Sequence, residues 1–249
     1  MLWRRLGEGG RIIGITIVLT TLYLLLQQVW LGLPGLLPGN RFFERPTAAE
    51  LEREKKDVAD RSEKALQSAP AGARHDIWQL GFYLGYASEF VGSYAMSAAN
   101  VQAKARQLTE PVLLEANRLS QTLGLGRVTP LATRTLDDFA RMTQRIEADE
   151  TGLAERISRA FSPHHHHLFL LGMHLGTEAA RIEGSGGSLS LPPRTQIRRH
   201  ATVLGIPPAL WEPLATAPHR AEQPSAVLAR YRNGLTALVA TLSSAPPAK

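Results

Sequence analysis

Four consecutive histidines at residues 164–167 form the part of this sequence best suited to bind a metal. The last of them, His167, stands with His174 and Glu178 at positions i, i+7 and i+11, so a helix would place the three side chains on one face. Imidazole and carboxylate ligands in this arrangement can hold zinc, copper or nickel. A histidine run that follows a proline at the start of a helix is also often merely solvated, so the pattern has two interpretations.

A group of basic residues is the second candidate site. Arg194, Arg198 and Arg199, with His200 beside them, are predicted to lie on one helix, where they could bind a phosphate group or an acidic partner. The same pattern is typical of a solvated helix face.

No catalytic signature is recognisable in the chain. Nothing in the sequence brings together a nucleophile, a general base and an orienting acid. The chain has no cysteine, which excludes disulfides, cysteine-ligated zinc, iron–sulfur clusters and thiol catalysis. Glu89 lies on a helix predicted to be buried, and we expect its carboxylate to pair with an arginine such as Arg118. We predict no cofactor, with a transition metal as the alternative. We also predict that the protein is not an enzyme. The alternative is an enzyme whose catalytic residues form no recognisable motif.

The composition is that of a folded protein. Hydrophobic residues make up 44% of the 249-residue chain and charged residues 20%, which is ordinary for a globular protein. The net charge of +6 is mild, and basic residues are interspersed with acidic ones. Because no nucleic-acid recognition motif accompanies them, we predict no nucleic-acid partner. A mildly basic surface suits contact with anionic lipid headgroups.

Residues 12–32 are predicted to form one transmembrane helix. No charged residue occurs between Ile12 and Asn40, and a helix of about 20 apolar residues spans a bilayer. Trp3 and Trp30 lie where interfacial aromatic residues are expected. A cleaved signal peptide is the competing interpretation, but no small-residue cleavage site follows the apolar core.

The charges that flank the anchor predict its orientation. Three arginines closely precede it, and two lie farther beyond its other end. The positive-inside tendency therefore places residues 1–11 in the cytoplasm and the domain in the periplasm, which makes the chain a single-pass protein of the inner membrane. Two Pro-Gly pairs in the linker, residues 33–46, must end or kink the membrane helix.

Residues 47–69 are predicted to form a charged connecting helix. Thr47 and Glu50 have the spacing of a capping box at its start. Leu51, Val58 and Ala65 form a thin apolar stripe, which favours a solvated helix lying on the domain over a coiled-coil stalk.

Stretches of the chain recur in the same order, which predicts an internal duplication. The matching pairs are residues 74–85 with 165–176, 123–125 with 204–206, and 130–133 with 213–216. The two copies then cover residues 75–161 and 164–245, and each is predicted to contain three helices. Residues 246–249 form the tail, which we expect to be frayed.

The first helix of each copy carries a row of small residues. Glycine costs about 1 kcal/mol in a helix interior, and close approach of another helix is the expected compensation. We therefore expect these two helices to pack together along a seam related by a pseudo-twofold axis. The predicted seam residues are Gly81, Gly85, Ser88, Gly92, Gly172, Gly176 and Ala179.

The second helices are predicted to end at glycine. Gly124 and Gly205 are each followed by an apolar residue, an arrangement that terminates helices. The second helix of the first copy is predicted to begin near Pro111, because proline suits the first helical turn.

Together these patterns predict an all-α protein with one N-terminal transmembrane helix and a soluble helical bundle made of two copies of a three-helix unit. The function that they favour is a membrane-anchored interaction or scaffold protein, an accessory subunit of a bacterial envelope complex whose protein partners are unknown. The alternative is a membrane-anchored protein that binds a metal or small ligand through the histidine-rich helix.

Overall fold

The computed structural model describes residues 46–70, 72–94, 99–128, 136–184, 195–216 and 222–244. The chain divides into two units, Met1–Pro46 and Thr47–Lys249, and all described residues except Pro46 belong to the second. The predicted cytoplasmic segment, the predicted membrane helix and the predicted tail lie outside the described residues, as does the rest of the linker. Within the described ranges, no helix is both long enough and apolar enough to span a membrane.

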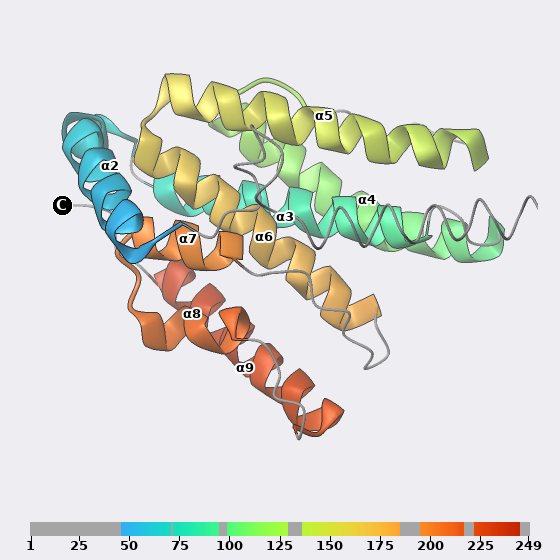
Figure 1. Ribbon diagram of the computed structural model, residues 1–249. Helices are drawn as coiled ribbons and strands as arrows, with labels where there is room; N and C mark the ends of the chain where they lie inside the picture. The colour runs from blue at the N-terminus through green and yellow to red at the C-terminus, as the bar shows by residue number, and fades with distance from the viewer. Residues whose placement is uncertain are drawn as a thin grey trace, which may run out of the picture. The chain divides into compact units, whose positions relative to one another are not determined.

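All regular secondary structure in the described residues is α-helical (Figure 1). The helices in chain order are α2 (Ala48–Ser68), α3 (Ala73–Tyr94), α4 (Ala99–Thr122), α5 (Leu136–Ala160), α6 (Pro163–Gly184), α7 (Thr195–Val203), α8 (Pro208–Ala215) and α9 (Pro224–Ser244).

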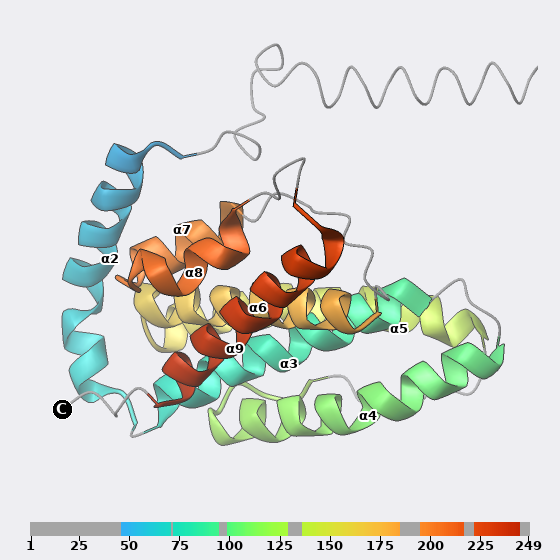
Figure 2. The same ribbon diagram turned by 90° about the horizontal axis from the view of Figure 1, so that it is seen from below.

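Two hydrophobic cores lie on either side of the pair α3 and α6. The first core is formed mainly by α3, α4 and α5, and the second by α6, α7, α8 and α9. Figure 1 shows α4 and α5 on one side of α6 and the orange and red helices on the other; Figure 2 shows α3 running beside α6 in a second view. The α3–α6 pair therefore joins the two halves of the described domain.

Four glycines allow α3 and α6 to approach each other at backbone distance. A Cβ atom at Gly81 or Gly85 would overlap a carbonyl oxygen of α6, and one at Gly172 or Gly176 would overlap a carbonyl oxygen of α3. In each case a glycine Cα–H bond faces a carbonyl oxygen of the other helix, a weak hydrogen bond that recurs at close helix contacts. The close packing offsets the cost of glycine in a helix interior.

The contacts across this pair are reciprocal. Gly81 faces Phe169 and Gly172 faces Trp78, while Gly85 faces Met173 and Gly176 faces Phe82. The side chain of Phe82 on α3 packs into the second core, and that of Met173 on α6 packs into the first. Each helix thus contributes to the core of the other half, which is the arrangement that a pseudo-twofold axis would produce.

α4 and α7 end in the same backbone geometry. Gly124 and Gly205 have φ angles of 70° and 71°. The next residue in each case donates its N–H to a carbonyl five residues earlier, Leu125 to Ser120 and Ile206 to Ala201, both at 2.9 Å. This is the Schellman arrangement, so the predicted helix ends at both glycines are confirmed.

The starts of α2 and α6 are fixed by side-chain caps. Thr47 Oγ1 accepts from the N–H of Glu50 at 3.3 Å, and the Glu50 carboxylate accepts from the N–H of Thr47 at 2.8 Å, which confirms the predicted capping box. At the start of α6, Ser162 Oγ accepts from the N–H of His165 at 3.3 Å. Pro163 is the first helical residue, a position that proline favours.

Two predictions about the helices are wrong. Pro111 lies inside α4 and does not begin it. The helix continues through the proline because side chains both before and after it are buried in the core that α4 shares with α3: Ala105, Leu113, Ala116 and Leu119. The second half of the domain contains four described helices, α6 to α9, where three were predicted. The additional helix, α8, follows Pro207 and buries Trp211 and Leu214.

Candidate functional site

The four histidines of residues 164–167 do not gather at one site. They lie in the first turn of α6, where successive side chains point about 100° apart. The backbone N–H of His164 donates to Ser62 Oγ of α2 at 3.0 Å. His166 Nδ1 donates to the carbonyl oxygen of Ala154 on α5 at 3.0 Å. These two hydrogen bonds attach the start of α6 to α2 and to α5.

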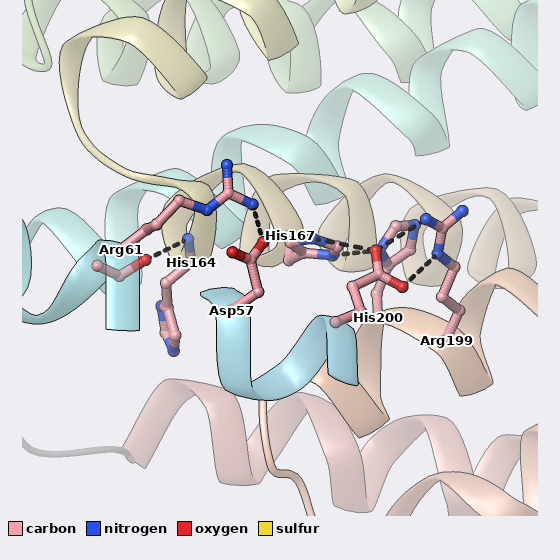
Figure 3. A network of polar contacts seen from close by, with 8 residues as sticks. Asp57, Arg61, His164, His167, Arg199 and His200 are labelled. Carbon is pink, nitrogen blue, oxygen red and sulfur yellow. Dashed lines mark hydrogen bonds and ion pairs between the residues drawn. The ribbon is translucent and has the colours of Figure 1, made fainter. Parts of the chain in front are cut away.

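His167 contacts the buried His200 of α7 (Figure 3). Their Nδ1 atoms lie 2.9 Å apart, a hydrogen bond in which one ring donates and the other accepts. His167 Nε2 lies 3.7 Å from Oε1 of Glu54 on α2. A proton on this Nε2 is attracted to the carboxylate, whereas a lone pair there would be repelled. We therefore assign the Nδ1–H donor to His200 and the acceptor to His167.

His174, two helical turns after His167 on α6, stacks on the ring of His200. Its ring lies 5.6 Å from that of His200, with 12° between the ring planes. Glu178 is buried and its Oε1 lies 3.4 Å from Nη1 of Arg181. No group of three or more His, Asp or Glu side chains among the described residues is placed to hold a metal ion. Metal binding by His167, His174 and Glu178 therefore stays a prediction.

Glu54 connects α2 to the histidine cluster, which we define as His167, His174 and His200. Its carboxylate accepts two hydrogen bonds from Arg199 of α7, from Nη2 at 2.8 Å and from Nε at 3.2 Å. This forked pairing fixes the carboxylate beside His167. Figure 3 shows the resulting line of polar groups from Arg199 and His200 through His167, with Asp57 and Arg61 paired nearby on α2.

Burial keeps the cluster neutral. It lowers the pKa of His167 to about 4, against the opposing attraction of Glu54, and it lowers the pKa of His174 to about 4, with Arg181 acting in the same direction. The pKa of His200 is lowered well below its ordinary value by burial and then by the other two imidazoles. Neutral imidazoles can accept hydrogen bonds or coordinate a cation at physiological pH.

A cleft of about 260 Å³ opens beside His174, between α3, α5 and α6. Its wall includes two carboxylates, three hydroxyls and one imidazole, together with Gly92 and Met173. The polar residues are Ser88, Glu89, Ser93, Glu150, His174 and Thr177. The predicted seam residues fall into three groups. Four of the five glycines, Gly81, Gly85, Gly172 and Gly176, lie at the α3–α6 contact. Ser88 and Gly92 line the cleft, and Ala179 is partly buried.

Glu89 pairs across the domain and not with the predicted arginine. Its Oε2 accepts from Nη2 of Arg181 on α6 at 2.9 Å. Arg118 is exposed and binds Glu115, three residues earlier on α4. The predicted pairing of Glu89 with an arginine is confirmed, but Arg118 was the wrong example, because the partner on α6 comes close to Glu89 only through the α3–α6 packing. Arg181 thus joins Glu89 to Glu178 at one end of the cleft.

The predicted basic patch is described only in part and stays a prediction. Arg194 lies outside the described residues, and Arg198 is exposed. Arg199 is engaged with Glu54, and His200 is only 4% exposed. The burial of His200 had a readable signal, because it shares a helix face with Ile197 and Ala201 at i−3 and i+1, both buried.

Comparisons of the chain with protein-family models, curated proteins and solved structures find no match.

Proposed function

We propose that this chain is a membrane-anchored helical interaction protein that serves as an accessory subunit of a bacterial envelope complex. The observation that carries the proposal is the attachment of α2, the first helix after the proposed anchor. Leu51 and Val58 of α2 are buried, and Glu54 binds Arg199 of α7. These contacts make α2 part of the folded domain, as expected for a subunit that holds a fixed surface near a bilayer.

The remaining parts of the proposal follow from the sequence. Residues 12–32 span the inner membrane once, the N-terminus is cytoplasmic and the domain is periplasmic, with membrane lipid as one partner and a protein of the envelope as the other. Residues 33–46 link the anchor to α2. Nucleic acid is not among the proposed partners.

The proposal also includes an internal duplication of a helical unit. Its support is the reciprocity of the α3–α6 contacts, together with the matching helix ends at Gly124 and Gly205. Two halves that share one closely packed helix pair form a rigid frame, which suits a role in presenting a surface to a partner.

Membrane fractionation of cells that express the full chain tests this function. We expect the chain to stay in the membrane pellet after alkaline carbonate extraction, whereas a variant that lacks residues 1–40 is soluble. In spheroplasts, added protease should digest the domain. Recovery of the full chain in the soluble fraction, or protection of the domain from protease in intact spheroplasts, would refute the proposal.

Binding of a transition metal is a second candidate function, favoured by the facing Nδ1 atoms of His167 and His200. Both imidazoles are buried, and a metal ion could replace the proton that they share. His174 and Glu178, the other two predicted ligands, follow His167 on the same helix.

Metal analysis tests this second candidate. The full chain, purified in detergent and equilibrated with Zn²⁺, should retain about one zinc per chain after dialysis. His167→Ala and His200→Ala should lose the zinc, while His75→Ala, a change on α3 away from the cluster, should keep it. Equal zinc content in all four proteins would exclude the site.

A further inference from the structure

The close helices α3 and α6 run in the same direction. Gly81 on α3 meets Phe169 on α6. One turn later on both helices, Gly85 meets Met173. Both helices therefore begin at the same end of the domain, the end at which α2 lies (Figure 1 and Figure 2). The positive ends of two helix dipoles point to this end, which favours a negatively charged ligand there.

Arg74 and His165 lie on the facing sides of these two helix starts. Each stands seven residues before a glycine of the close contact, Gly81 for Arg74 and Gly172 for His165. Seven residues are nearly two full turns, so each side chain is on the face that its helix turns toward the other. Burial, and then the positive charge of Arg74, lowers the pKa of His165 to about 4. The guanidinium therefore lies close enough to His165 to act on it.

Four buried nitrogens in the first two turns of α3 and α6 have no hydrogen-bond partner among the described residues: Arg74 Nε, Trp78 Nε1, His164 Nδ1 and His165 Nε2. Trp78 is 3% exposed and His165 is 0% exposed, so neither side chain is open to bulk water. Arg74 Nε and Trp78 Nε1 carry a hydrogen at any physiological pH, which makes both of them donors. An unpaired buried donor destabilises a fold, so an acceptor is expected at each one.

Ser162 fixes the tautomer of His165. Ser162 Oγ accepts the backbone N–H of His165 at 3.3 Å and lies 2.8 Å from His165 Nδ1. Ser162 is buried, so its hydroxyl hydrogen also needs an acceptor, and Nδ1 is the acceptor within reach. Because its lowered pKa keeps the imidazole neutral at neutral pH, the one ring hydrogen is then on Nε2. His165 Nε2–H is therefore a third buried donor without an acceptor.

We propose that the facing starts of α3 and α6 bind a small oxyanion of the phosphate or sulfate type, held between Arg74 and His165. Such an ion presents several oxygen acceptors to the unpaired donors, and hydrogen bonds with a charged partner are the strong ones. The Arg74 charge and the two helix dipoles offset the cost of taking the ion out of water. Arg74 is partly exposed, which leaves a small ion a route from solvent.

A cation fits this place less well than an anion does. Arg74 would repel it, and the nitrogens whose hydrogens are fixed offer N–H groups and no lone pairs. Asp76, the acidic residue in the first turn of α3, is two residues after Arg74 and so about 200° round the helix, where its charge acts on Arg118 of α4.

The oxyanion site is distinct from the histidine cluster. His167 is two residues after His165, about 200° round α6, and contacts Glu54 of α2 and His200 of α7. The site is also independent of the proposed membrane role, and each can fail without the other.

Calorimetric titration of the full chain in detergent with inorganic phosphate at pH 7.5 tests the proposal. Sodium chloride keeps the ionic strength constant, so that general screening of charge does not change during the titration. We expect saturable binding of about one phosphate per chain, as at other anion sites beside helix starts. Sulfate should compete for the same site because it presents the same tetrahedral set of oxygen acceptors.

Two variants and a matched control separate this site from the general charge of the protein. Arg74→Gln removes the charge and should weaken phosphate binding about 10-fold or more. His165→Phe keeps a buried ring without the Nε2–H donor and should weaken it about 10-fold. Arg118→Gln makes the same charge change as the first variant on an exposed part of α4, and should leave the affinity unchanged. In phosphate-free buffer, Arg74→Gln should keep the thermal midpoint of the wild type, because Arg74 Nε has no hydrogen bond to lose.

Any of three results overturns the proposal. The first is the absence of saturable binding by the wild-type chain at 50 mM phosphate. The second is an Arg118→Gln variant that loses as much affinity as Arg74→Gln. The third is unchanged affinity in both Arg74→Gln and His165→Phe, each shown to be folded by circular dichroism.

Discussion

Acidification from pH 7.0 to 5.5 is expected to destabilise the domain by about 5 kcal/mol. Four histidines of α6, two of them buried and two partly buried, carry this effect. Burial lowers the pKa of His164, His165, His167 and His174 to about 4 in the folded state. In the unfolded chain a histidine has a pKa of about 6.5. The unfolded state therefore binds more protons over this range, and the free energy of unfolding falls as the pH falls.

The magnitude follows from proton linkage. Between pH 7.0 and 5.5, protonation of one histidine with a pKa of about 6.5 stabilises the unfolded chain by about 1.2 kcal/mol, while its folded-state counterpart stays neutral. Four such residues give about 5 kcal/mol, which is comparable with the whole stability of many domains. The stability they provide is fully present above pH 6.5 and is lost progressively toward pH 4. His200, whose pKa is also lowered, adds to the effect in the same direction.

Urea unfolding of the full chain in non-ionic detergent, followed by circular dichroism, measures this loss. With a slope of about 2 kcal/mol per molar urea, the midpoint should fall by about 2.5 M between pH 7.0 and 5.5. His164→Gln should reduce the pH dependence by about a quarter, whatever its effect on stability at pH 7.0. A midpoint that moves by less than about 0.5 M would show that these imidazoles are not held neutral by the fold.

Three substitutions and two comparison variants test the packing, each by its urea midpoint at pH 7.0. Gly85→Ala should lower the free energy of unfolding by more than about 3 kcal/mol, because its methyl group would overlap the Met173 carbonyl. Gly152→Ala, whose methyl group would lie 3.9 Å from the nearest atom, should stabilise α5 by up to about 1 kcal/mol. Equal effects of the two substitutions would contradict the close α3–α6 contact. Gly205→Ala should cost about 1 kcal/mol because its φ is 71°, and a neutral result would argue against the helix end seen here. Glu54→Gln should cost about 1 kcal/mol by weakening the bond to Arg199, and more than the exposed Glu155→Gln; the reverse order would contradict the attachment of α2.

Local sequence patterns predicted the features that depend on a few neighbouring residues. Thr47 and Glu50 satisfy each other's backbone N–H groups, which needs only their spacing. Gly124 and Gly205 adopt the left-handed conformation that glycine tolerates, so the helix ends were readable as well. The all-α fold follows from the same helical periodicity, extended over the chain.

The site could not be predicted in the same way because its contacts join distant parts of the chain. His167 is close to His200 only because α7 packs against α6, and Glu54 of α2 reaches His167 and Arg199 from a third helix. The partner of Glu89 was missed for the same reason. Helical spacing places residues on one face of a helix, but it does not say which other helix covers that face.

The mass of the particle that contains this chain, after mild solubilisation from its native membrane, tests the proposed function most directly. Affinity purification through a C-terminal tag, followed by gel filtration with light scattering, gives the protein mass after subtraction of the detergent. The account predicts a particle larger than one 27.2 kDa chain, with a second envelope polypeptide at a fixed ratio that persists after cross-linking in intact cells. A particle that holds a single chain of 27.2 kDa and no other polypeptide would contradict it.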